Sequence, residues 1–253
     1  MSSGGQSPPT LYAFPRLGRS SPPSWGYTAA VFIGHFAVGF AAKRAAPRAS
    51  LGVLIAAPLL LDLLWPMFLI AGIESVRIDP GNTVFTPLDL HDYPYTHSLV
   101  MSVIWSLLAG SGYWAATRYR NGALAVGLGV FSHWILDFVT HRPDMPIYPG
   151  STTYLGLGLW NSRPATMAVE IAMFVAGVAI YARATRPNNR TGSLALWGLV
   201  AFLAVAYLGN AFGPPPPSAT MIAYAGLTGW LFVLWAWWID RNRMSIMPPS
   251  STT

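Results

Sequence analysis

The sequence predicts an all-α fold, a polytopic membrane helical bundle of about seven transmembrane helices. Of its 253 residues, 53% are hydrophobic and only 9% are charged, whereas about a quarter of the residues in soluble proteins are charged. Seven apolar runs also approach or reach the roughly 20 residues that a helix needs to cross a bilayer. The lipid bilayer is therefore the first partner that we expect.

The elements are taken in order along the chain. Residues 1–26 are rich in Ser, Gly and Pro and lack the periodicity of a packed element, so we expect a flexible N-terminal tail. The transmembrane domain should cover residues 27–240, followed by a short C-terminal tail at residues 241–253. The expected spans are residues 27–43, 50–72, 98–117, 122–141, 164–182, 193–212 and 219–239. The first and fifth of these runs are short for a span.

The basic residues indicate the orientation of the bundle. With seven spans, the connections after spans one, three, five and seven share one side of the membrane. Ten of the 15 Lys and Arg residues lie there, namely Lys43, Arg44, Arg48, Arg118, Arg120, Arg183, Arg186, Arg190, Arg241 and Arg243. The positive-inside rule then places the N-terminus outside and the C-terminus in the cytoplasm. Topology thus explains the net charge of +6, and we expect no nucleic acid as a partner.

One stretch, from Phe131 to Pro146, carries the strongest chemical signal. It sets His133, Asp137 and His141 at steps of four in an otherwise apolar run. On a helix these side chains share one face, and His and Asp at this spacing can bind one metal ion or pass one proton. Because the chain has no Cys, any metal must be bound by N and O ligands.

Other ionisable residues are expected at the same depth. Counted along their spans, His35, Asp62 and Glu170 lie with His133 and Asp137 roughly 5 to 15 Å below the outer surface. His97 begins the third span, and His91 and Asp92 lie in the loop just before it.

A lone ionisable group in hydrocarbon costs at least about 2.5–3.5 kcal/mol, a cost that groups gathered around a cation share. We favour a metal site. The two alternatives are that these residues serve separately in packing, or that they form a proton or ion pathway.

Two further features favour a built site. Pro66 lacks the N–H that would bond the carbonyl of Asp62, so the second span should kink there and free a backbone oxygen. The outer loop from Ile73 to Thr96 contains several Pro and acidic residues and is long enough to act as a lid. An ordinary solvated loop is the alternative interpretation of that segment.

Four motifs together resemble one known family. They are GHF with His35, the D-x-x-x-P of Asp62 and Pro66, the THS of residues 96–98 preceded by His91, and the SHxxLD that contains His133 and Asp137. This ordered set, between about Gly34 and Trp160, resembles the YdjM-type inner-membrane family, described as metal-dependent hydrolases. The resemblance implies a multi-pass protein of the bacterial cytoplasmic membrane with a His/Asp metal centre and hydrolytic activity. The chain departs from the family pattern at Leu64, where a second acid is common, and at Asp92, where an Arg is common.

The candidate site residues fall into three roles. We expect His35, Asp62, His97, His133 and Asp137 to bind the metal directly, with His91, His141 and Asp144 as outer or second-metal residues. Mixed His and carboxylate ligands fit Zn, which we favour, or Mn or Fe(II). Such a metal with one open position lowers the pKa of its bound water to about 7. Glu170 or Asp92 would then act as the general base, since a nearby unbound carboxylate suits proton transfer.

The predicted function is a membrane-embedded, metal-dependent hydrolase with its site in the outer half of the bilayer. A site at this depth suits a small or lipid-like ester or phosphoester. The alternative is a proton- or metal-ion-coupled transporter, which would need polar residues that continue to the cytoplasmic side. Spans six and seven have no charge inside them, which favours the enzyme. The sequence carries no signal for an oligomeric state.

Overall fold

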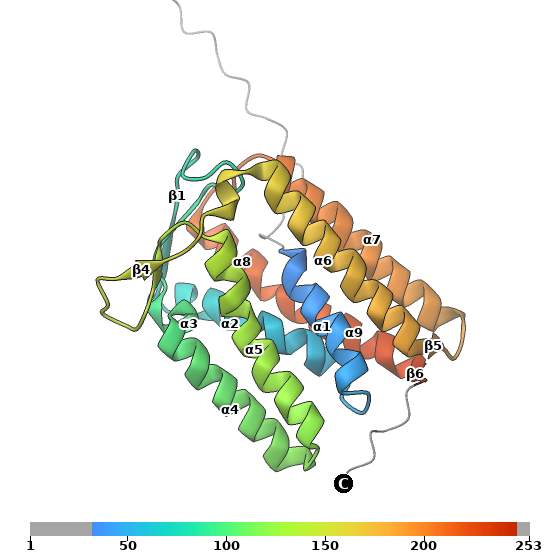
Figure 1. Ribbon diagram of the computed structural model, residues 1–253. Helices are drawn as coiled ribbons and strands as arrows, with labels where there is room; N and C mark the ends of the chain where they lie inside the picture. Colours follow the sequence, from blue (N-terminus) through green and yellow to red (C-terminus); the bar gives the residue numbers. More distant parts are fainter. Residues whose placement is uncertain (1–31, 247–253) are drawn as a thin grey trace, which may run out of the picture.

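The apolar runs fold as helices in the computed structural model, which describes residues 32–246 (Figure 1). The helices are α1 (Ile33–Ala45), α2 (Leu51–Ile70), α3 (Pro94–His97), α4 (Leu99–Thr117), α5 (Arg120–Thr140), a 3-10 turn (Leu159–Asn161), α6 (Arg163–Ala184), α7 (Arg190–Phe212), α8 (Ala219–Leu227) and α9 (Gly229–Arg241). Three short antiparallel pairs join β1 (Ser75–Ile78) to β2 (Leu88–Asp92), β3 (Met145–Pro146) to β4 (Tyr154–Leu155), and β5 (Thr185–Pro187) to β6 (Arg243–Ser245). The predicted all-α bundle is confirmed.

Six helices within the described residues are long and apolar enough to cross a membrane. They are α2, α4, α5, α6, α7 and the nearly continuous pair α8–α9. α1 has 13 residues, or about 20 Å of helix, which is shorter than a hydrocarbon core of about 30 Å. The expected first span began at residue 27, and its residues 27–31 lie outside the described part. The protein is therefore a multi-pass helical membrane protein, for which the expected count of seven spans is approximate.

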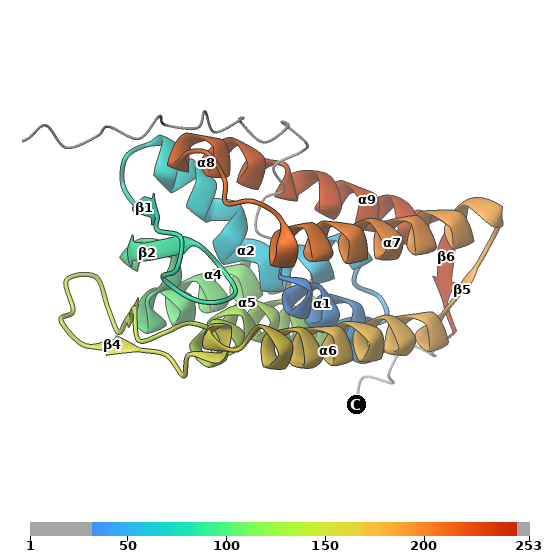
Figure 2. The same ribbon diagram turned by 90° about the horizontal axis from the view of Figure 1, so that it is seen from above.

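α1 lies at the centre of the bundle, among α2, α5, α6 and α7 (Figure 2). Glycines allow this close packing, because a Cβ at Gly39 would lie 2.7 Å from the carbonyl oxygen of Leu54, and one at Gly177 would collide with the backbone of Ala37. Small residues at helix contacts are typical of membrane bundles, where backbones must approach closely. α4, by contrast, packs chiefly on α5 and presents most of its side chains outward.

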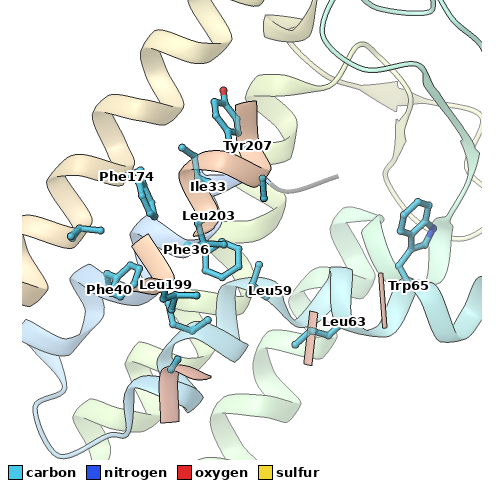
Figure 3. Packing of buried hydrophobic residues seen from close by; sticks show 14 of the residues in the cluster. Ile33, Phe36, Phe40, Leu59, Leu63, Trp65, Phe174, Leu199, Leu203 and Tyr207 are labelled. Atoms are coloured by element: carbon cyan, nitrogen blue, oxygen red, sulfur yellow. The ribbon is translucent and has the colours of Figure 1, made fainter. Parts of the chain in front are cut away.

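Large apolar side chains fill the space around α1 (Figure 3). They come from four helices: Ile33, Phe36 and Phe40 from α1, Leu59 and Leu63 from α2, Phe174 from α6, and Leu199 and Leu203 from α7. Phe40 and Leu203 have no exposed surface. This packing holds α1 in one rotation, which directs the neighbouring His35 toward α5.

The segment from Ile73 to Thr96, expected to be a lid or a solvated loop, folds as a hairpin against the bundle. Ser75 pairs with Asp92 and Ile78 with Leu88, with a bulge after Ser75. Phe85, Leu88 and Leu90 are buried in the core. Together with β4, the hairpin covers one end of the helices, and β5 and β6 lie at the opposite end (Figure 2).

The end that carries β5 and β6 gathers the basic connections. The Lys43 ammonium forms a 2.7 Å ion pair with Asp240 of α9 and donates to the carbonyl of Ala49. The side chain of Arg243 is buried and donates to the hydroxyl and the carbonyl of Thr185. Part of the expected C-terminal tail is therefore a paired strand, while residues 247–253 and the expected tail at residues 1–26 lie outside the described residues. The direction in which this end faces stays a prediction.

Candidate metal centre

Four imidazoles and two carboxylates come together near the hairpin end of the bundle. His35 lies on α1, Asp62 on α2, His97 at the end of α3, His133 and Asp137 on α5, and His141 directly after α5. The i, i+4 spacing places His133 and Asp137 on one face of α5, as the sequence predicted. The short helix α3 ends at His97, whose ring contacts His133 on that face. Apart from Asp62, each of these residues is buried.

The carboxylate of Asp137 is the centre of this cluster. Its Oδ1 lies 3.2 Å from Nε2 of His35, and its Oδ2 lies 3.0 Å from Nε2 of His133. The Nε2 atoms of His97 and His141 are each 3.9 Å from Oδ2. Four histidines thus direct the same ring nitrogen at one carboxylate.

Asp62 approaches the cluster from the other side. Its Oδ1 lies 3.5 Å from Nε2 of His97 and 3.9 Å from Nε2 of His133. Two overlapping groups result, His35 with His133 and Asp137, and Asp62 with His97 and His133, each with ligand atoms within 4.8 Å of one another. Because His133 belongs to both groups, these buried residues could hold a metal ion.

The second ring nitrogen of His133 fixes its tautomer. Nδ1 lies 2.7 Å from the backbone carbonyl of Pro58, and a carbonyl oxygen can only accept a hydrogen bond. Nδ1 must therefore carry the proton, which leaves a lone pair on Nε2 in the neutral ring. Metal-binding histidines are commonly oriented in this way by a carbonyl or a carboxylate behind the ring.

A longer relay fixes His97. Glu74 is buried and accepts hydrogen bonds from the backbone N–H groups of Tyr95 and Thr96, both at 2.8 Å. The hydroxyl of Thr96 donates to Oε2 of Glu74 at 2.7 Å, and its oxygen lies 2.6 Å from Nδ1 of His97. Since the hydroxyl proton is used on Glu74, the oxygen accepts from Nδ1–H, and Nε2 of His97 also presents a lone pair.

His141 follows the same pattern. Its Nδ1 lies 3.0 Å from Oδ1 of Asp144, which also accepts a 3.0 Å hydrogen bond from the hydroxyl of Tyr93. Burial, followed by the nearby Asp144 carboxylate, raises the pKa of the Tyr93 hydroxyl well above its ordinary value, so this hydroxyl stays a donor. The ring of Trp160 packs against His141 with the ring centres 4.1 Å apart. His141 therefore borders the cluster, with its Nε2 3.9 Å from Oδ2 of Asp137, and its role as an outer or second-metal residue stays a prediction.

These tautomers leave the middle of the cluster rich in acceptors. The Nε2 atoms of His97 and His133 are 3.3 Å apart, and both face the carboxylates of Asp62 and Asp137. Lone pairs at this distance repel each other unless positive charge lies between them. A divalent cation fits this donor set, because imidazole nitrogens and carboxylate oxygens are its ordinary ligands.

The structure separates the remaining candidates from the cluster. His91 lies on the hairpin, with Nε2 3.2 Å from the hydroxyl of Ser75 and Nδ1 3.2 Å from the carbonyl of Asp89. Asp92 is exposed at the end of β2. Glu170 is buried on α6 and lines a cavity of about 180 Å³ together with His35 and Asp137. Of the two proposed bases, only Glu170 therefore lies beside the cluster.

Sequence reasoning missed several residues that support the histidines. Glu74 and Tyr93 belong to the segment for which the sequence predicts a lid or a solvated loop, and the carbonyl of Pro58 has no signature of its own in the sequence. Trp160 ends an apolar GLGLW segment and gave no indication that it would pack on His141. For Glu74, the available signal is an acidic residue placed just after the second expected span.

An apolar cavity of about 90 Å³ opens beside the cluster. Phe36, Leu59, Leu63 and Phe232 line it, and the ligand candidates Asp62, His97, Asp137 and His141 border it. The side chain of Asp62 is 35% exposed, against 6% for that of Asp137. The cluster is thus accessible on the Asp62 side, beneath the hairpin and next to the junction of α8 and α9.

Spanning helices around a buried His/carboxylate cluster define a multi-pass membrane protein with a candidate metal centre. The sequence model of the family described as YdjM inner membrane protein matches residues 31–212, and the chain belongs to this family. The match includes every residue of the cluster and ends before α8. Neither the curated proteins nor the solved structures gave a match.

Proposed function

We propose that the protein is a membrane-embedded, metal-dependent hydrolase that acts on a lipid-like ester or phosphoester. The observation that carries this proposal is the convergence of His Nε2 lone pairs and two carboxylates beside an apolar cavity. A structural polar cluster would be expected to pair donors with acceptors, whereas this one gathers acceptors.

Each side chain then has a defined role. His35, Asp62, His97, His133 and Asp137 would hold the ion, and His141 stands within reach of the same carboxylate. A divalent metal such as Zn, or Mn or Fe(II), supplies Lewis acidity and lowers the pKa of a bound water. The carbonyl of Pro58, the Thr96–Glu74 pair and Asp144 orient the rings so that Nε2 stays free of a proton.

Glu170 is the proposed proton acceptor. It is 4% exposed, and its Oε2 has no hydrogen-bond partner among residues 32–246. It faces the same cavity as His35 and Asp137. A carboxylate that lies near a metal site without belonging to it is suited to accept a proton from water.

The proposed substrate class is based on the walls of the cavity. Apolar side chains of α1, α2, the hairpin and the α8–α9 pair line it, and the acidic and imidazole groups on its wall are those of the cluster. Ligand sites of this kind bury the apolar part of a substrate and orient it with a few polar groups. An acyl or prenyl chain would lie along these walls, with the scissile bond at the open side of Asp62.

The test separates binding from chemistry. Purified protein loaded in turn with Zn, Mn and Fe(II) would be offered generic phosphoester and carboxylic ester substrates in detergent. Glu170→Gln should keep its metal and lose activity by about 10²–10⁴-fold, and Asp92→Asn tests the other carboxylate. If no loaded form hydrolyses any substrate while reconstituted vesicles show metal-dependent or pH-driven flux, the protein is a coupled transporter and the hydrolase proposal is wrong.

A further inference from the structure

A second cavity, of about 350 Å³, lies away from the candidate metal centre. Its walls are the tip of the β1–β2 hairpin, the start of α6, the end of α7, and the Pro214–Pro216 segment. Leu88 and Ile222 line both this cavity and the one beside the metal centre, so the two are neighbours. No ligand candidate of the metal centre lines the second cavity, so the inference drawn from it does not depend on the proposed hydrolase activity.

This cavity lies at the level of the ends of the membrane-spanning helices. Arg163 begins α6, Phe212 ends α7 and Ala219 begins the last candidate span, so three spans have their ends here. In a multi-pass protein the ends of spans lie at the level of the lipid headgroups. A cavity at this level is exposed to the charged part of the lipids.

Arg163 brings a positive charge to this cavity. Its Nη2 donates to the carbonyl of Val84 at 2.8 Å, and its guanidinium carbon lies 5.6 Å from the ring centre of Phe212. These contacts hold the guanidinium in place, while its Nε has no hydrogen-bond partner among the described residues. Within residues 32–246, Arg163 forms no ion pair with an acidic side chain, and no carboxylate lines the cavity.

Asn210 adds a second free donor. It lines the same cavity from α7, and its buried Nδ2 has no partner in the part of the chain that the structure describes. Buried amide donors are nearly always paired, because an unmade hydrogen bond leaves the cost of removing the group from water uncompensated. The Nε–H of Arg163 and the Nδ2 amide of Asn210 both lack an acceptor in the described residues, which points to an acceptor brought by a ligand.

We infer that this cavity is a binding site for a phosphate group, with Arg163 and Asn210 as its donors. Arginine is suited to phosphate because its planar fork makes two parallel, charge-assisted hydrogen bonds. The level of the cavity favours the headgroup of an anionic lipid as the source of the phosphate, and free inorganic phosphate is the other source of the same chemistry.

The experiment measures ligand-dependent stabilisation of the full-length protein in neutral detergent. Phosphatidylglycerol, phosphatidylcholine and inorganic phosphate would be titrated separately, with thermal unfolding as the readout and native mass spectrometry to count retained lipid. The variants are Arg163→Gln, which removes the cation, and Asn210→Asp, which replaces the amide donor by a carboxylate that repels phosphate. Arg77→Gln is the matched control, because Arg77 is exposed on β1 at the same end of the bundle.

Phosphatidylglycerol should raise the unfolding temperature of wild type and of Arg77→Gln more than phosphatidylcholine does. Both cavity variants should lose this difference and bind the lipid at least about tenfold more weakly, as expected for the loss of a charge-assisted hydrogen bond. Stabilisation by inorganic phosphate alone, lost in the same variants, would assign the site to free phosphate. Equal binding by wild type and both cavity variants, or an equal loss in Arg77→Gln, would overturn the inference.

Discussion

Glu74 provides a way to test the orientation of His97 without touching a metal ligand. In Glu74→Gln the amide oxygen can still accept from the N–H groups of Tyr95 and Thr96, which both bond to Oε1. The amide nitrogen replaces Oε2, however, and it can only donate. The hydroxyl of Thr96 then loses its acceptor and turns its proton toward Nδ1 of His97, 2.6 Å away.

The consequence is a change of tautomer. With Nδ1 of His97 accepting, the ring proton moves to Nε2 and points at Asp62 and at Nε2 of His133, where a metal would bind. Changes in residues that orient ligands typically cost 10–100-fold in metal affinity, which corresponds to about 1.4–2.7 kcal/mol. The fold should survive, because the substitution keeps the shape and two of the three hydrogen bonds.

The assay is a titration of metal-free protein with Zn in competition with a chelator, together with thermal unfolding of both proteins without metal. Asp79→Asn is the control, since it removes the same charge from an exposed position of the same segment. An unchanged Zn affinity in Glu74→Gln would refute the tautomer argument. So would an equal loss in Asp79→Asn, because the effect would then be one of net charge.

Three further predictions concern topology, packing and pH. A single Cys at the exposed Thr152 should react with an impermeant thiol reagent added outside, and one at Asn188 should not; reversed labelling would turn the site toward the cytoplasm. Gly177→Ala should destabilise the protein by about 1–3 kcal/mol, because its Cβ would collide with the backbone of α1, whereas Gly112→Ala, in open space, should be neutral or slightly stabilising in the same unfolding assay. Burial raises the pKa of Tyr93 in the folded state, so the free energy of unfolding should fall as the pH rises above about 10. This fall should be smaller in Tyr93→Phe, and identical alkaline unfolding profiles of the two proteins would contradict the prediction.

The positions of the helices and the depth of the candidate site along them could be predicted from the sequence. Apolar length defines the spans, and steps of four along α5 place His133 and Asp137 on one face whatever the tertiary structure. Counting residues from the ends of spans predicts the same depth for His35 and Asp62, and the structure links them through Asp137 and His133. These deductions work because a membrane restricts helices to a few orientations.

The loops were less accessible to such reasoning. The hairpin depends on the burial of Phe85 and Leu88 against helices that are distant in sequence, so neither periodicity nor charge could separate it from a solvated loop. For the same reason His91 and Asp92, which were candidates through their closeness to the third span, lie on a strand away from the cluster. Glu74 and Tyr93 act through hydrogen bonds that form only after the hairpin has folded.

The central claim is that the cluster around Asp137 binds a metal ion, and metal analysis of purified protein beside its His133→Ala variant tests it most directly. His133 belongs to both candidate ligand groups, so its loss should remove bound metal. Thermal stability should fall with it, because an ion that binds only the folded state adds RT ln(1 + [L]/Kd) to the free energy of unfolding. Adding Zn should raise the unfolding temperature of wild type and leave that of the variant unchanged. Equal metal content and an equal response to Zn in both proteins would contradict the metal centre.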